Sequence, residues 1–428
     1  MIPAGAGCLR AWVPRGLVEL ASGQRPLQPP SADGLVAAEV SWRDGRLESI
    51  GPLPEGSSAP ERMVLPRLVE PHAHLDKAFT WAQASNRSGT YSGALTANLA
   101  EHRSRTAASV RDRAERALTL GFRHGLRALR THIDSLGPGA DCSWEALQDV
   151  RARWRMRVEL QLVALLPVDH WSTAEGERLA RRVAASCGGL LGGVLGPPCR
   201  GPATQEALHR LLQLADRLSC GIDLHIDEAQ SGPGEGILEL LQALDRWPVS
   251  VPITCSHASS LSLLSNHRLE QVVARMARHD LTVVALPLTN GWLLGREEGR
   301  SPLVRPIAPL LQLQQGGVSV AVGGDNIQDP WFPGGNLDPL ALIGQSMPLA
   351  QLAPWDRLGL IPFTTEPARV LGLSWDGVLR PGAPADLIVL EATSWTEVLA
   401  APPDRALVVA GRSVPSSGLA EIQHSDVN

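Results

Sequence analysis

The sequence predicts an α/β fold, a (β/α)8 TIM-like barrel accompanied by a small β-sandwich that both chain ends build. First, its 428 residues suit one barrel of roughly 250–300 residues plus a smaller module. Second, apolar strand-like runs alternate with amphipathic helix-like stretches from about residue 63 onward. Third, both ends are rich in strand signals. We therefore expect sandwich strands in 1–62, the barrel in 63–365 and further sandwich strands in 366–428.

The small sandwich is predicted from strand signals near both ends. Gly34–Trp42 and Arg46–Ile50 flank Asp44-Gly45, a dipeptide typical of tight hairpin turns. Near the other end, Ala385–Leu390 and Arg405–Arg412 are apolar runs, and the second contains a glycine turn. We expect these later strands to pair with the N-terminal ones.

The barrel is predicted from eight apolar runs with amphipathic stretches between them. The runs are Met63–Val69, Leu126–Thr131, Val158–Leu165, Leu190–Leu195, Gly221–Ile226, Ser250–Cys255, Leu281–Leu286 and Val318–Val322. The helix-like stretches include Ala108–Gly121, Thr173–Ala185, Thr204–Leu218, Gly236–Asp245 and Leu269–His279.

Composition excludes several classes of function. A net charge of −5, a pI near 6.2 and the lack of a basic run argue against nucleic-acid binding. No stretch approaches the ~20 apolar residues of a membrane helix, and the N-terminus lacks a signal-peptide pattern. The six cysteines are scattered without a CxxC pair. These features predict a reduced cytoplasmic protein and leave its oligomeric state open.

Candidate site residues follow the apolar runs, because barrel enzymes carry their chemistry at the C-terminal strand ends. His72 and His74 stand one residue apart, so both point the same way on an extended backbone and can share one cation. Alone, this pair also fits two polar loop histidines. Later runs, however, end in His225, His257 and Asp325.

Three imidazoles and one carboxylate form a ligand set that suits zinc or ferrous iron better than calcium or magnesium. Such an ion turns bound water into a usable hydroxide at neutral pH. Glu228, three residues beyond His225, is placed to move protons, and His257 to hold the hydroxide or polarise the substrate. The alternative is that one or two of these side chains are simply hydrogen-bonded polar residues. Other histidines, on helix-like stretches, are predicted to be surface residues: His102, His209, His267 and His279.

Lys77 is the only lysine of the chain, and every other long cation is arginine. Its retention indicates a position where a planar guanidinium does not serve. We expect its ammonium at the mouth of the pocket, either anchoring the loop to Asp76 or Asp134 or meeting the substrate. Chance survival of one lysine is the alternative.

Together these motifs resemble the amidohydrolase superfamily, most of all its cytosine deaminase and isopropylammelide aminohydrolase branch. The resemblance spans roughly residues 35 to 412 in the expected order. The motifs are Pro71-His72-Ala73-His74-Leu75-Asp76-Lys77, Asp223-Leu224-His225-Ile226-Asp227-Glu228, Ser256-His257-Ala258-Ser259, Gly324-Asp325-Asn326, Asp329-Pro330-Trp331 and Arg380-Pro381-Gly382-Ala383-Pro384-Ala385-Asp386-Leu387.

The resemblance implies a mononuclear site of zinc or iron(II), since no lysine stands at strand four to bridge two metals. It implies roles for residues matched one by one: metal ligation by His72, His74, His225 and Asp325, proton transfer by Glu228, stabilisation of the hydroxide by His257, and substrate contact by Gln161 and Trp331.

The chain also departs from cytosine deaminases, which usually carry His-Asp-Asp where Gly324-Asp325-Asn326 stands and Pro-Gln near Leu165–Val168. Asn326 can donate a hydrogen bond to the substrate, which a carboxylate cannot. We therefore predict a metal-dependent hydrolase of non-peptide C–N bonds that deaminates a pyrimidine- or triazine-like heterocycle, with cytosine a poor substrate. The alternatives are a ring-opening cyclic-amide hydrolase and a non-catalytic binding protein.

Overall fold

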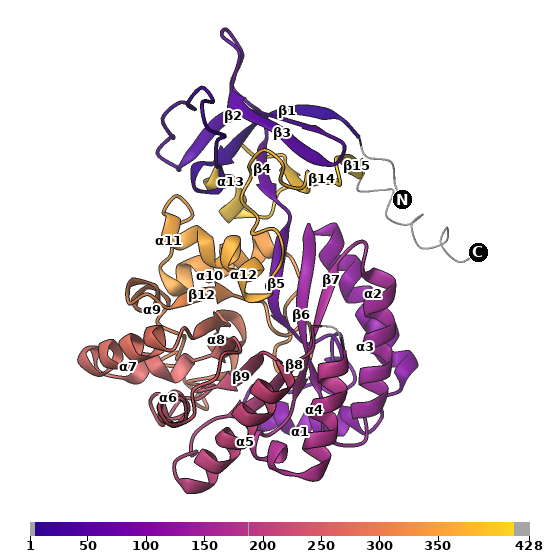
Figure 1. Ribbon diagram of the computed structural model, residues 1–428, viewed down its shortest axis with the longest axis vertical. Helices are drawn as coiled ribbons and strands as arrows, with labels where there is room; N and C mark the ends of the chain where they lie inside the picture. Colours follow the sequence, from indigo (N-terminus) through magenta and orange to yellow (C-terminus); the bar gives the residue numbers. More distant parts are fainter. Residues whose placement is uncertain (1–4, 187, 415–428) are drawn as a thin grey trace. The chain divides into compact units, whose positions relative to one another are not determined.

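The computed structural model describes residues 5–186 and 188–414, which form two compact units (Figure 1). One unit comprises the described parts of Met1–Val69, Leu120–Arg127 and Asp338–Asn428, and the other comprises Glu70–Thr119 and Ala128–Leu337. A compact unit need not fold independently, so the domain boundaries at 62/63 and 365/366 stay a prediction. Residues 415–428, within the expected C-terminal part, lie outside the described residues.

Eight strands form one sheet in sequence order, from β5 to β12, and the pairings from β6 onward are parallel. Helices α3 to α7 lie around these strands in Figure 1. This arrangement confirms the predicted (β/α)8 fold. The strands are β5 (Leu68–Ala73), β6 (Leu126–Asp134), β7 (Glu159–Leu165), β8 (Leu190–Leu195), β9 (Ile222–Ile226), β10 (Ile253–His257), β11 (Thr282–Ala285) and β12 (Ser319–Val322).

Each helix outside the strands buries one face. In α5 (Pro202–Leu218), for example, Leu208, Leu211, Leu212 and Ala215 are buried at helical spacing. The other helices of this unit are α1 (Tyr91–His102), α2 (Ala107–Arg123, whose last turn belongs to the other unit), α3 (Ala140–Trp154), α4 (Ala174–Ala185), α6 (Glu235–Arg246), α7 (Asn266–Arg278), α8 (Pro287–Leu293) and α9 (Leu310–Gln315), with short 3-10 turns at Val168–Ser172 and Ser259–Leu263.

Glu70 joins the first and last strands where the barrel closes. Its carboxylate accepts backbone hydrogen bonds from His72 and from Gly324, each at 3.0 Å. One residue further on, Asp325 N donates to His72 O at 2.9 Å. Burial of the Glu70 carboxyl raises its pKa to about 8. The closure places the side chains that follow β12 beside those that end β5.

The second sheet has seven strands in the order β15-β14-β13-β4-β1-β2-β3, so both chain ends build one small β unit, as expected. Its apolar core includes Val13, Val40, Ile50 and Leu387. The strands are β1 (Gly7–Pro14), β2 (Leu35–Arg43), β3 (Arg46–Pro52), β4 (Met63–Pro66), β13 (Leu387–Leu390), β14 (Arg405–Val409) and β15 (Arg412–Val414). The helices of this unit are α10 (Pro339–Ala350), α11 (Arg357–Leu360), α12 (Thr365–Val370) and α13 (Trp395–Ala400), with 3-10 turns at Arg15–Leu17 and Ile361–Phe363.

One predicted strand is corrected. Met63–Val69 was expected to be the first barrel strand, but Met63–Pro66 pairs with β1 and β13 in the small sheet. The barrel strand begins at Leu68 instead, beyond Pro66, which ends the earlier pairing. Among the described helices, none is long and apolar enough to cross a membrane.

Candidate active site

Three histidines and one aspartate converge at the C-terminal ends of the barrel strands. His72 lies on β5 and His74 directly follows that strand, His225 lies on β9, and Asp325 follows β12. His74 Nε2 lies 3.3 Å from His225 Nε2 and 3.2 Å from Asp325 Oδ1. His72 Nε2 lies 3.5 Å from the same carboxylate oxygen. All four residues are buried, so these polar atoms are shielded from solvent.

The donor set fits a cation. Four donors placed tetrahedrally about 2.1 Å from one ion lie about 3.4 Å apart, which matches the observed spacings. Burial and the neighbouring imidazoles lower the pKa of His72 and of His225 well below the usual value, so both rings are neutral and offer a lone pair. His72 Nε2 and both Asp325 oxygens have no hydrogen-bond partner. Such buried polar atoms require a partner, and a divalent metal ion satisfies them together.

A chain of hydrogen bonds fixes which nitrogen of His72 faces the cluster. Ser256 Oγ donates to Asp223 Oδ1 at 2.7 Å, and Asp223 Oδ2 accepts from Arg130 Nη1 at 2.7 Å. The hydroxyl has one hydrogen, so at 2.9 Å it must accept from His72 Nδ1. The proton therefore sits on Nδ1, and the Nε2 lone pair is directed at the candidate metal site.

We predict that Ser256→Ala weakens metal affinity by roughly 10–100-fold, the usual effect of removing a group that orients a ligand. The change leaves His72 Nδ1 without an acceptor and lets the ring adopt the other tautomer. Equilibrium dialysis against buffered zinc measures the affinity directly. Ser259→Ala is the matched control, because Ser259 is equally buried but donates to the backbone oxygen of Asp227. Equal affinity in both variants would contradict the assignment.

His132 also belongs to this cluster, although the sequence analysis did not select it. It lies on β6, and its ring stacks on His72 with centroids 3.8 Å apart. His72, His132 and His225 form a second group whose ligand atoms lie close enough to hold an ion. The signal in the sequence was the position of His132 at the end of the second apolar run, in Arg130–Asp134.

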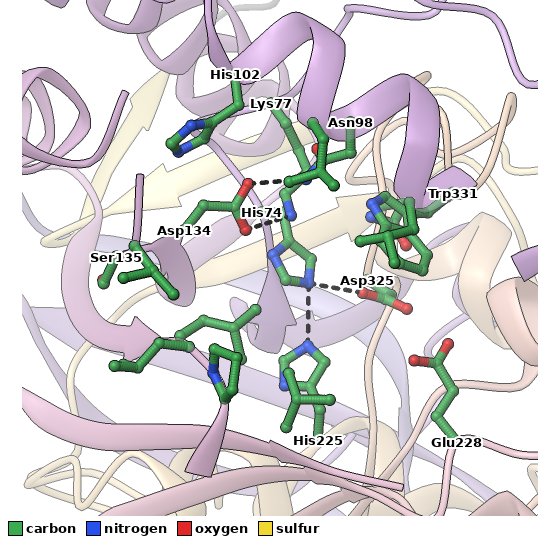
Figure 2. Close-up of a pocket in the computed structure, with 18 of the residues that line it drawn as sticks. His74, Lys77, Asn98, His102, Asp134, Ser135, His225, Glu228, Asp325 and Trp331 are labelled. Atoms are coloured by element: carbon green, nitrogen blue, oxygen red, sulfur yellow. Dashed lines mark hydrogen bonds and ion pairs between the residues drawn. The ribbon is translucent and has the colours of Figure 1, made fainter. Parts of the chain in front are cut away.

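A pocket of about 330 Å³ opens beside the cluster. Figure 2 shows Lys77, Asn98 and His102 on one side of it, with His225 and Glu228 on the opposite side and His74 between them. Its lining consists of His74, Lys77, Tyr91, Leu95, Asn98, Leu99, His102, Asp134, Ser135, Leu136, Leu165, Leu166, Pro167, Val194, His225, Glu228, His257, Asp325, Asn326 and Trp331.

Glu228 and His257 face each other in this pocket. Glu228 Oε1 lies 3.5 Å from His257 Nδ1, and burial together with the Asp325 charge raises the pKa of Glu228 well above its usual value. The amide nitrogen of Asn290 lies 3.0 Å from His257 Nδ1, and because it can only donate, the His257 proton sits on Nε2. His257 also has a φ of 72°, a left-handed conformation that typically persists at functional sites.

Asn326 and Trp331 both line the pocket, as predicted for substrate contacts. Asn326 Nδ2 donates to Asp329 at 2.9 Å, and its Oδ1 accepts from Thr289 at 3.2 Å, so the orientation of the amide is fixed. Trp331 packs edge-on against Tyr91, with ring centroids 5.0 Å apart. The pocket thus has an aromatic wall and an oriented amide in the same lining as the Glu228 carboxyl group.

Lys77 lies in the lining and is held by a buried ion-pair network. Its Nζ donates to Asp134 Oδ1 at 2.8 Å, while Arg105 pairs with the other oxygen of Asp134 and with Asp76. Burial alone would lower the pKa of Lys77, but Asp134 and Asp76 outweigh it, so the pKa lies above the usual value. The ammonium is therefore charged and faces the pocket.

We predict that Lys77→Arg keeps the metal but lowers turnover at least about tenfold, which is ~1.4 kcal/mol in the barrier. The guanidinium is larger and planar, and Arg105 already occupies the second oxygen of Asp134. Steady-state kinetics with metal analysis measures both effects. Arg111→Lys, an exchange in the partly exposed pair with Asp149, controls for the swap itself. Unchanged turnover would show that the lone lysine has no special role.

Two predicted positions differ in the structure. Gln161 does not line the pocket; its side-chain oxygen accepts from Arg130 Nε at 2.7 Å, nearer the start of β7. His102, expected at the surface, is 4% exposed and lines the pocket, where its Nδ1 accepts from Gly139 N at 3.3 Å. The helix α1 turns this histidine inward because it lies across the pocket.

Comparisons with known proteins agree with this geometry. Residues 195–415 match the model of the family described as "Amidohydrolase family". A pterin deaminase from Rhizobium rhizogenes is 32% identical over 399 residues, which cover 91% of this chain and 90% of the relative. The chain belongs to the amidohydrolase family.

Solved structures of other amidohydrolase-like enzymes share the fold. A 5-methylcytosine deaminase from Klebsiella pneumoniae superposes with a TM-score of 0.79 at 23% identity, covering 96% of this chain and 97% of that one. An N-isopropylammelide isopropylaminohydrolase from Burkholderia multivorans gives a TM-score of 0.71 at 25% identity, covering 95% and 98%. Membership in the family and the histidine cluster make this amidohydrolase a metal-dependent hydrolase of non-peptide C–N bonds.

Proposed function

We propose that this amidohydrolase deaminates a bicyclic aminated heterocycle of the pterin class, with water replacing the exocyclic amino group as oxygen and ammonia leaving. The observation that carries the proposal is the placement of Glu228 and His257 in one pocket, beside a set of buried nitrogen and oxygen lone pairs. The similarity to a pterin deaminase over nine-tenths of both chains supports the ring system. The ring types expected from the sequence, pyrimidine and triazine, are thereby extended to a two-ring system.

We assign the metal site to His72, His74, His225 and Asp325, with zinc or iron(II) as the cation, because imidazole and carboxylate suit either ion. When bound, the cation acts as a Lewis acid that lowers the pKa of water toward neutrality. His132, which stacks on His72, forms the wall behind these ligands.

Each side chain of the pocket then has its own role in the reaction. Glu228 carries one proton from the attacking water to the ring nitrogen, and a second, from the hydroxyl formed on the ring carbon, to the departing amino group, which leaves as ammonia. His257 Nε2–H donates to the oxygen that forms on the ring carbon. The second hydrogen of Asn326 Nδ2 is available to a ring oxygen or nitrogen, since Asp329 accepts the first. Lys77 and Trp331 orient the ring from the other sides.

The test is a panel of heterocycles offered to the metal-loaded enzyme, with ammonia release as the readout: pterin, cytosine, 5-methylcytosine, guanine and N-isopropylammelide. We expect pterin to give the highest kcat/KM and cytosine to be at least about tenfold poorer, which is ~1.4 kcal/mol. The reason is that cytosine fills less of the 330 Å³ pocket and meets an amide, Asn326, in place of a carboxylate. Cytosine ahead of pterin would overturn the ring assignment.

A ring-opening cyclic-amide hydrolase is the second candidate, because the same groups serve either reaction. It consumes water without releasing ammonia. A product that gains the mass of one water and retains all its nitrogen would replace deamination with ring opening.

A further inference from the structure

One rim of the pocket is apolar and solvent-exposed. Leu95, Leu99, Leu136 and Val194, here called the apolar rim, have exposed fractions of 43%, 51%, 47% and 38%. Nine large hydrophobic residues are exposed in the described part of the chain, and these four all line this single pocket. Scattered exposed leucines are ordinary, but a cluster around a pocket is typical of a ligand-contacting surface.

Three elements build the apolar rim. Leu95 and Leu99 lie one turn apart on α1, Leu136 follows β6, and Val194 lies on β8. The same face of α1 supplies Asn98 and His102, which Figure 2 places across the pocket from Glu228 and His225. This helix face covers an open cavity, so its leucines stay about half exposed. Leu95 and Leu99, on this face of α1, therefore lie across the pocket from Glu228 and His225, while Val194 on β8 pairs in register with His225 on β9.

Among the residues that the structure describes, the lining offers no unpaired lysine or arginine side chain to an anionic substituent on the apolar rim. The lining contains three carboxylates, Asp134, Glu228 and Asp325, but one ammonium, Lys77. Lys77 is already paired with Asp134 at 2.8 Å. A carboxylate on a substituent that lies against the apolar rim would lose its hydration without a free lysine or arginine side chain to pair with.

We infer that the substrate ring carries an uncharged apolar substituent, an alkyl chain of several carbons, that lies against the apolar rim while the amino group faces Glu228. The inference rests on the proposed deamination and adds the chemical class of the substituent. Each methylene that the rim buries improves kcat/KM by roughly fourfold if fully removed from water.

The experiment compares each ring with its substituted forms: pterin with 6-propylpterin and 6-carboxypterin, and cytosine with 5-propylcytosine. We expect the propyl form to exceed its parent by at least about tenfold in kcat/KM, a smaller gain than complete burial of three carbons would give. We expect the kcat/KM of the carboxylate form to fall below that of the parent. The double variant Leu95→Gln/Leu99→Gln should bring the propyl-to-parent ratio close to one. Leu349→Gln, on α10 and 44% exposed outside the pocket, should leave the ratio unchanged.

Binding separates this inference from the proposed reaction. Calorimetry on metal-loaded Glu228→Gln protein gives the propyl-to-parent affinity ratio without turnover. If no heterocycle releases ammonia, the proposed deamination is overturned. The propyl-to-parent affinity ratio then still tests whether the apolar rim binds the alkyl substituent. A propyl form that binds and reacts no better than its parent overturns the inference, as does a ratio that Leu95→Gln/Leu99→Gln leaves unchanged. Leu136→Gln replaces the double variant if that protein does not fold.

Discussion

Glu228→Gln is expected to keep the metal and lose about 10²–10⁴-fold in kcat, the usual contribution of a positioned acid–base group. Glutamine has nearly the same shape and can occupy the same place, where Glu228 Oε1 lies 3.5 Å from His257 Nδ1. It cannot, however, take a proton from water or deliver one to the leaving group. Steady-state kinetics of ammonia release together with elemental analysis measures the two properties separately.

Glu235→Gln is the matched control for this experiment. Glu235 is also a buried glutamate, but it accepts from Cys199 N at 3.0 Å, pairs with Arg200 and does not line the pocket. We expect this variant to retain turnover within about threefold, because it changes no proton transfer. Full activity in Glu228→Gln would mean that another group moves the proton.

His72→Ala is expected to lose both the metal and the activity. The wild-type protein should carry about one equivalent of zinc or iron, the stoichiometry of a four-ligand site, and the variant much less. Removing the Lewis acid costs several kcal/mol in the barrier, so turnover should fall by roughly 10³-fold or more. Elemental analysis of protein purified without chelators, followed by an assay with added zinc, measures both.

His267→Ala controls for the loss of an imidazole. His267 is exposed on α7, where its Nε2 lies 3.0 Å from Gln271 Nε2, so its removal leaves the cluster intact. We expect wild-type metal content in this variant. Active His72→Ala protein that contains no transition metal would contradict the metal-dependent mechanism.

The sequence by itself determined the barrel and most of its site. Apolar runs found seven of the eight barrel strands within a few residues, because buried parallel strands are almost continuously apolar. The alternation of side chains on extended backbone predicted that His72, on β5, and His74, just after it, point to one side. Because parallel strands end at the same rim, His225 and Asp325 had to lie near them. Such features depend on local periodicity, which a single sequence records.

Tertiary structure alone decided the remaining features. Met63–Pro66 belongs to the small sheet because it pairs there with β1 and β13. An apolar run in the sequence does not show which sheet its strand joins. Gln161 lies near the start of β7, where its side chain contacts Arg130 and does not line the pocket. Residues on one face of a strand lie at different heights along the barrel axis, and the sequence does not show which of them reach the pocket. The placement of α1 turned His102 and the apolar rim toward the pocket. These outcomes depend on contacts between segments distant in the chain, which local patterns do not encode.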